Sequence, residues 1–342
     1  MTPETSMTPV AIGPLHPRHG IHAPTSGTPD RTPGSVRRTA TTDMLRPEGL
    51  SGPLILVGRA RDLITELGPS TRTAAEAATR VVVDYIGGRT VEELTTTPDR
   101  PALQAVLGRS AAGGFRGAVL AADPAVPEEE GLLNLLLDDI PVATLVSGHA
   151  WSAGDEQART PHVSMRSTLI ADQCAGFASD ATIMTEIARS GRAPVVTGPA
   201  APSLANGDPL AWHELDPLPP HAMRRSRRMD IRPGTPTTVD VLFRDSYVRP
   251  DGLETVVHEY TVLMTLDADT GVVTSCEAAP RVLPWAECPA AAASARRLAG
   301  QPVAGLRAHV RQSFLGTSTC THLNDTLRSL EDVPALLSLL AN

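Results

Sequence analysis

The sequence has 342 residues, of which 41% are hydrophobic and 20% charged, so it predicts a globular protein with room for two domains. All 30 basic residues are arginine, and the absence of lysine excludes Schiff-base and PLP catalysis and the lysine-dependent phosphate loop. A formal net charge of -8 argues against nucleic-acid binding, which needs clustered cations. The longest apolar run, "GLLNLLLDDI", is too short and too polar to span a membrane.

The first residues of the chain lack hydrophobic periodicity. Residues 1–35 are rich in Pro, Thr, Gly and His, so we expect a disordered tail. His16, His19 and His22 recur there every three residues, and a flexible segment offers them no preorganised geometry for a metal. Because this start is polar, we expect no secretory signal peptide, and therefore a cytoplasmic protein with reduced thiols. The four cysteines are Cys174, Cys276, Cys288 and Cys320.

Two structured blocks follow the tail. The Pro/Gly-rich stretch 190–221 reads as a linker between a first block, 36–189, and a second block, 222–342. The blocks can be aligned: "RRTATTDM" matches "RRSRRMDI", and "LILVGRARDL" can be laid beside "VDVLFRDSYV". At the end, "LLNLLLDDIP" is placed opposite "CTHLNDTLRSL", with Asn134 opposite His322. We interpret this as an internal duplication in which the first copy is degenerate.

The second block shows its elements more clearly than the first. Alternating apolar residues predict strands over 239–248 and 256–266, and "DADTG" predicts a hairpin turn before a third strand. Three helices follow, over about 289–299, 304–314 and 319–340, the last broken before Pro334. Each copy is thus expected to be an α+β domain, an antiparallel sheet with helices on one face. The basic run "RRSRR" suggests a solvated or edge strand.

Two cysteines are expected at helix starts. Pro289 favours a helix that begins next to Cys288, and Ser318 or Thr319 can cap the helix that contains Cys320. The positive end of a helix dipole lowers the pKa of a thiol, so we expect thiolates at both positions.

His322 and Asp325 lie three residues apart on the last expected helix, so an aspartate could orient an imidazole there. With Cys288 and Cys320 nearby, the cluster suits zinc or an iron–sulfur cluster. Without metal, it suits acid–base or thiolate chemistry. The plain alternative is a small core cysteine, a surface histidine and a helix-start carboxylate.

Other residues give weaker signals. Cys276 alternates inward on a strand and suggests a buried apolar residue. His258 and Tyr260 share a mostly apolar strand face, which favours a core or rim position, although that face could border the site. The glycine-rich "AAGGFRG" follows no expected strand and has no lysine, so phosphate binding is not expected.

The second block resembles an uncharacterised bacterial family, domain of unknown function DUF 2889. The motifs that carry the resemblance are "RRSRRMDI", "VDVLFRDSY", "LPWAECPAA" and "CTHLND". The resemblance implies no known activity. More remotely, "ECPAAAASARRLAG" followed by a Cys-x-His helix is similar to iron–sulfur scaffold proteins. That similarity implies Cys288, Cys320 and His322 as ligands.

These patterns favour a cytoplasmic enzyme that acts on a small-molecule carbonyl or thioester, as an isomerase, lyase or cyclase, without NAD or flavin. In this hypothesis His322 is the acid or base, Asp325 orients it, and Cys288 and Cys320 supply thiolates. The alternative is a non-catalytic zinc or iron–sulfur protein. We expect the first copy to shape the pocket or a homodimer interface.

Overall fold

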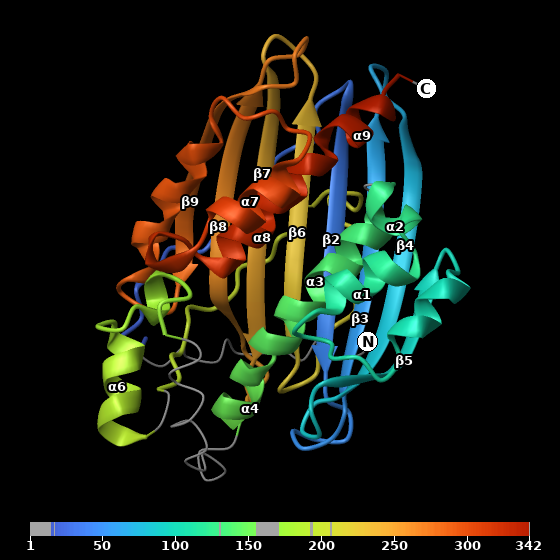
Figure 1. Ribbon diagram of the computed structural model, residues 1–342. Coiled ribbons are helices and arrows are strands. Elements are labelled where there is room, and N and C mark those ends of the chain that lie inside the picture. Colours follow the sequence, from blue (N-terminus) through green and yellow to red (C-terminus); the bar gives the residue numbers. More distant parts are fainter. Residues whose placement is uncertain are drawn as a thin grey trace, which may run out of the picture.

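The computed structural model describes residues 15–16, 18–129, 131–154, 171–191, 194–205 and 207–341. Its centre is one nine-stranded antiparallel sheet in the order β1-β9-β8-β7-β6-β2-β3-β4-β5 (Figure 1). The strands are β1 (Ile21–His22), β2 (Ser35–Leu45), β3 (Leu54–Thr65), β4 (Thr71–Asp84), β5 (Thr90–Thr97), β6 (Met223–Arg232), β7 (Thr237–Val248), β8 (Glu254–Leu266) and β9 (Val273–Leu283). The expected α+β class is confirmed.

Helices cover one face of this sheet (Figure 1). The first set is η1 (Pro101–Val106), α1 (Phe115–Ala122), α2 (Ala125–Glu128), α3 (Leu132–Val146) and α4 (Gly148–Gly154), followed by η2 (Ala175–Phe177) and α6 (Thr182–Ser190). The second set is η3 (Cys288–Leu298), α7 (Leu306–Ser313), η4 (Gly316–Ser318), α8 (Thr321–Ser329), η5 (Leu330–Asp332) and α9 (Val333–Ser338). The three expected helices of the second block are therefore present, and the last is interrupted by η5 just before Pro334.

Two apolar clusters lie between the sheet and the helices. One joins β6 to β9 with η3, α7, α8 and α9, and the other joins β2 to β5 with η1, α1 and α3. The alternation of strand residues explains this, since side chains two apart point to the same face. Val262 and Met264 of β8, for example, are almost fully buried beneath the helices.

The basic run "RRSRR" is buried at the centre of the sheet, so the expected solvated or edge strand is wrong. It lies on β6, which pairs with both β2 and β7. Arg225 is fully buried, where its Nε and Nη2 donate to both carboxylate oxygens of Asp245 at 2.9 and 3.0 Å. Arg227 donates in the same two-pronged way to Asp139 of α3 at 2.8 and 2.6 Å. The charge is neutralised by carboxylates rather than by solvent.

The opposite face of the sheet is covered by the two segments expected to be a tail and a linker. The described part of the tail is ordered: β1 pairs with β9, and the Thr25 backbone N–H donates to Glu259 at 2.6 Å. From the linker, Trp212 packs on Leu242. The ring nitrogens of His213 lie 2.9 Å from the hydroxyls of Thr39 and Thr41 on β2. Composition alone did not predict that these two segments are ordered. Their order comes from polar groups that pair with buried polar groups of the sheet.

We predict that Arg225→Gln lowers the free energy of unfolding by roughly 3–5 kcal/mol, because it leaves Asp245 and Asp139 buried without their shared guanidinium. Urea unfolding followed by circular dichroism measures this change. The matched control is Arg80→Gln, which removes a solvent-exposed pair with Glu93 and should hardly move the midpoint. Equal midpoints for the two variants would contradict the importance of the buried network.

Candidate functional site

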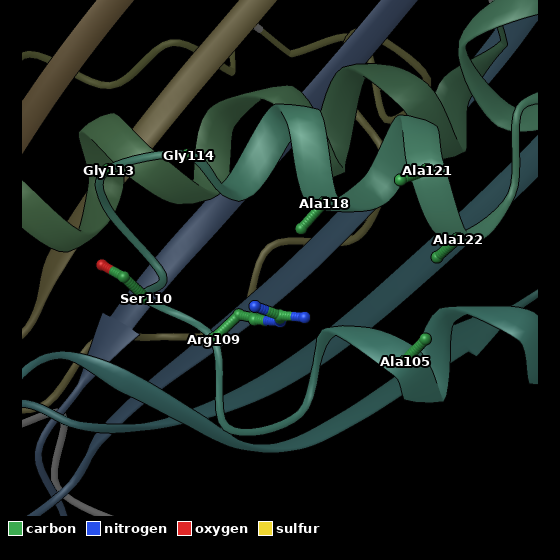
Figure 2. A pocket seen from close by; sticks show the side chains of 8 residues that line it. All are labelled: Ala105, Arg109, Ser110, Gly113, Gly114, Ala118, Ala121 and Ala122. Atoms are coloured by element: carbon green, nitrogen blue, oxygen red, sulfur yellow. The ribbon is translucent and has the colours of Figure 1, made fainter.

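The cleft shown in Figure 2 does not contain the chemical groups that the sequence singled out. It has a volume of about 540 Å³ and lies between η1 and α1, where small residues line it. Gly113 and Gly114 of the glycine-rich stretch form part of its wall, and Arg109 extends into it (Figure 2). The described residues that line this cleft include no carboxylate, histidine or cysteine. The candidate site therefore has to be built from side chains elsewhere.

Adjacent strands place two of these side chains. Asp245 of β7 and His258 of β8 are cross-strand partners, next to a break in the register between Asp245 and Ser246. The side chains of both residues point to the face of the sheet that the helices cover. Phe243 and Tyr260, each two residues away on the same strands, point to that face as well.

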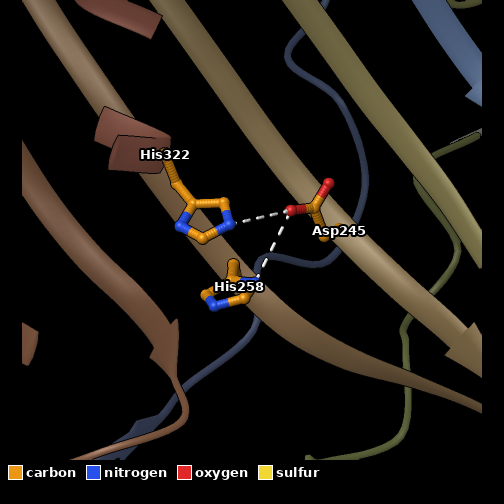
Figure 3. Close-up of side chains that lie close together, drawn as sticks. All are labelled: Asp245, His258 and His322. Carbon is orange, nitrogen blue, oxygen red and sulfur yellow. Dashed lines mark ion pairs between the residues drawn. The ribbon is translucent and has the colours of Figure 1, made fainter. Parts of the chain in front are cut away.

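The third side chain comes from α8. The imidazole of His322 stacks on that of His258, with ring centroids 3.7 Å apart and planes inclined by 21° (Figure 3). One carboxylate oxygen, Asp245 Oδ2, lies 3.5 Å from His258 Nδ1 and 3.6 Å from His322 Nε2. Among the described residues, these three form the one group of His, Cys, Asp or Glu whose ligand atoms all lie within 4.8 Å of one another.

Asp245 is held as a buried carboxylate. Its side chain has no exposed surface, and both of its oxygens accept hydrogen bonds from Arg225. Although burial alone would raise its pKa, the Arg225 guanidinium and the neighbouring histidines hold the pKa of Asp245 well below its usual range. Asp245 is therefore ionised at neutral pH.

One of the two imidazoles beside this carboxylate, that of His322, is neutral. Burial, together with the nearby His258, holds the pKa of His322 well below its ordinary value, despite the opposing effect of Asp245. Burial also lowers the pKa values of His19 and His149 to about 4, and His258 adds to the effect on each. His258 Nδ1 is buried and makes no hydrogen bond with the described residues. Neutral imidazole is the form that binds metals.

The expected thiolates at Cys288 and Cys320 are wrong. Cys288 begins the 3₁₀-helix η3 and Cys320 precedes the first turn of α8, so the expected helix starts are present. Both thiols are buried, however, and burial raises the pKa of Cys288 well above its usual value and that of Cys320 to about 11. Desolvation of the thiolate outweighs the helix dipole. Both are protonated thiols at neutral pH.

Asp325 does not orient His322, contrary to the expectation from their spacing. Its carboxylate is buried and pairs with Arg328 at 2.7 Å, and with Arg116 and Arg225 at 3.4 Å each. Three guanidinium groups therefore neutralise it. The partners of His322 are Asp245 and, at 3.8 Å from its Nδ1, the sulfur of Cys320.

Asp245 and His258 were not among the expected site residues. The alignment of Arg61-Asp62 with Arg244-Asp245 matches two aspartates of the two blocks but does not indicate that either is buried. His258 stood out as a histidine on an apolar strand face. The packing of α8 over β7 and β8 is a long-range contact, and no local pattern in the sequence predicts it.

We predict that the thiols of the folded protein react slowly with iodoacetamide at neutral pH and quickly in denaturant.

Burial also raises the pKa of Cys276 from 9.0 to about 12, so the folded state holds that proton more tightly than the unfolded state. The resulting stabilisation is complete below pH 9 and is lost as the pH rises toward 12. Mass spectrometry and unfolding at several pH values measure both effects. Rapid labelling of Cys288 or Cys320 in the folded protein would contradict the burial.

None of the described helices is long and apolar enough to cross a membrane. No curated protein and no solved structure matches the chain. Residues 223–335, about a third of the chain, match the model of a family described as a protein of unknown function, DUF2889. This match confirms the family resemblance of the second block, and Asp245, His258 and His322 all lie within it.

Proposed function

We propose that Asp245, His258 and His322 bind one divalent metal ion, most simply zinc. The observation that carries this proposal is the spacing of their ligand atoms. The carboxylate oxygen lies 3.5 and 3.6 Å from the two imidazole nitrogens, which is too far for a good hydrogen bond. Tetrahedral ligands about 2.0–2.2 Å from a common zinc ion are roughly 3.3–3.6 Å from one another.

The protonation states support the same proposal. An ionised carboxylate and a neutral imidazole are the forms in which Asp245 and His322 bind metal, so these two ligands release little proton when a metal binds. Arg225 fixes the Asp245 carboxylate from behind, and the Cys320 sulfur lies near the second ring nitrogen of His322. Such outer contacts orient the ligands of a metal.

The proposed chemistry follows from the number of ligands. Three protein ligands leave a coordination position for water or substrate, as in catalytic rather than structural zinc sites. The side chains of His258 and His322 are 13% and 15% exposed, so the site is not sealed from solvent. We therefore propose a metal-dependent enzyme that acts on a small molecule with a polarisable carbonyl, ester or thioester group.

A second candidate is acid–base catalysis without metal, in which Asp245 stabilises the protonated form of His322. The observation that favours it is the approach of His322 Nε2 to 3.6 Å from the ionised Asp245, which stabilises a proton on that imidazole. Thiolate chemistry is disfavoured in either case by the burial of Cys288 and Cys320. The proposed metal site also differs from the iron–sulfur ligand set of Cys288, Cys320 and His322, because among the described residues His322 is grouped with Asp245 and His258.

We also propose that the two halves of the sheet arose by duplication. Each half is a four-stranded meander followed by helices, and β2 of one half pairs with β6 of the other. The buried ion pairs repeat in the same places. Equivalent pairs are Arg37–Asp230 and Arg224–Asp43 between the halves, and Arg38–Asp62 and Arg225–Asp245 within them.

The ion pairs favour a new alignment of the last helices. Arg38 reaches Asp332 at 2.8 Å, and its equivalent, Arg225, reaches Asp139 at 3.4 Å. This matches "DDIP" (138–141) with "EDVP" (331–334), instead of Asn134 with His322. Opposite His258 the first half has Ala75, the cross-strand partner of Asp62, so the first half lacks this histidine of the proposed site.

We predict that protein loaded with zinc and then dialysed retains stoichiometric metal, and that His322→Ala and His258→Ala each weaken zinc binding by at least about tenfold. Metal analysis and competition with a chromophoric chelator measure the affinity. His309→Gln is the control, because this histidine packs against Phe314 of the same half, outside the cluster. Equal zinc binding by all four proteins would contradict the proposed site, and metal-free protein with intact fold would leave the acid–base candidate.

The duplication predicts a specific pattern among related sequences. When first halves are aligned with second halves from many relatives, Asp139 should fall opposite Asp332 and Pro141 opposite Pro334. A profile comparison of the two halves measures this. An alignment that instead places Asn134 opposite His322 would contradict the new register.

A further inference from the structure

A histidine of the N-terminal segment, His19, lies close to the level of the histidine cluster. β1 pairs with β9, and their register places Ile21 opposite Leu283. The pairing of β9 with β8 ends one residue short of Leu283 and His258, so these two residues are level with each other. His19 is therefore two residues away from a position that is level with His258.

The backbone beside His19 continues this pairing toward the same face of the sheet. The Gly20 backbone N–H donates to the carbonyl oxygen of Leu283 at 3.0 Å. Leu283 is buried in the apolar cluster beneath the helices, and Ile21 packs against that cluster. Because side chains two residues apart on an extended chain point to the same side, His19 shares the face of Ile21, which is the face of the proposed metal site.

A second contact places the imidazole of His19 beside β8. The backbone N–H of Val256 donates to the carbonyl oxygen of Pro199 at 2.9 Å, so the chain before Pro199 lies against the strand. A Cβ on Gly198 would lie 1.8 Å from the carbonyl oxygen of Val256 and 3.5 Å from His19 Nε2. His19 Nε2 is thus close to the strand near Val256, two residues before His258.

Both ring nitrogens of His19 are buried, and neither makes a hydrogen bond with the described residues. Burial, together with neighbouring histidines, lowers the pKa of His19 to about 4, so the imidazole is neutral at neutral pH and carries one donor and one acceptor. Buried polar atoms without partners destabilise the folded state. A molecule bound at this place would supply the missing partner.

His19 is close to the cluster of Figure 3 but is not one of its members. Among the described residues, the group whose ligand atoms lie within 4.8 Å of one another consists of Asp245, His258 and His322. His258 is nevertheless near enough to contribute to the lowered pKa of His19. Such a placement suits a group that contacts a molecule on the metal rather than the metal itself.

We propose that His19 forms a hydrogen bond with the water or substrate in the open coordination position of the metal ion. This inference rests on the metal site proposed above. A neutral imidazole accepts a hydrogen bond from a bound water or N–H group, or donates one to a carbonyl oxygen, according to which nitrogen holds the proton. His19 is then a substrate-binding residue, and it orients a small carbonyl compound against the metal.

Calorimetric titration of the zinc-loaded full chain with acetohydroxamate tests this proposal, because this molecule binds zinc and carries a carbonyl oxygen and an N–H group. We expect His19→Leu to weaken acetohydroxamate binding by about tenfold, the effect of one lost hydrogen bond. Its zinc affinity, measured by competition with a chromophoric chelator, should equal that of the unchanged protein. His22→Leu is the matched control, because His22 belongs to the same segment and is exposed. It should bind zinc and acetohydroxamate normally.

Thermal unfolding of the metal-free protein separates this role from a structural one. His19→Leu removes two buried, unpaired polar atoms, so the midpoint of unfolding should stay the same or rise. A histidine that the fold requires would lower the midpoint when it is replaced.

The proposal is wrong if zinc-loaded His19→Leu binds acetohydroxamate like the unchanged protein, or if this variant lowers the midpoint of unfolding more than His22→Leu does. It is also wrong if His19→Leu loses zinc, since His19 would then be a metal ligand. If the unchanged protein itself retains no zinc, the proposed metal site is wrong, and the role of His19 falls with it.

Discussion

The buried pairing of arginine with aspartate across the middle of the sheet is the interaction on which the rest of the structure depends. β2 and β6 lie at the centre and carry arginines to both faces, each neutralised by carboxylates of the neighbouring strands or covering helices. A guanidinium presents five donors in a rigid planar fork that binds carboxylates bidentately, so arginine suits these buried pairs better than an ammonium would. Such a network adds little net stability over an apolar core, but it penalises every misaligned register, because a shift would leave charges buried and unpaired.

The candidate site depends on this network of ion pairs, because Arg225 binds Asp245. Arg225 binds Asp245 of β7 and, more loosely, Asp139 of α3 and Asp325 of α8. The Asp245 carboxylate, which faces His258 and His322, is therefore held in place by Arg225, the same residue that joins the two halves. Arg116 of α1 continues the chain of ion pairs from Asp325 to Asp138 of α3. Sheet, helices and the proposed metal site therefore share one set of charges.

The sequence predicted where strands and helices lie better than it predicted which side chains are buried. Strand alternation in β8 and the proline at 334 predicted strands and helices close to those observed, because these are local signals. The burial of Arg224 to Arg228 could not be read locally, since a charged run is usually solvated and some of its partners, such as Asp43 and Asp139, lie far along the chain. His322 was identified from its own helix, but its partners Asp245 and His258 lie 77 and 64 positions earlier in the numbering and meet it only through tertiary packing. The thiolate prediction failed for a related reason: helix position was visible in the sequence, and depth of burial was not.

The central claim is that two histidines and one aspartate, rather than the cysteines, form the metal site. X-ray absorption at the zinc edge of the zinc-loaded protein tests it most directly. The account predicts only nitrogen and oxygen neighbours at about 2.0–2.2 Å, with imidazole scattering from two rings that disappears in part when His322 is replaced. A sulfur shell at about 2.3 Å would show that Cys288 or Cys320 binds the metal and would contradict the account.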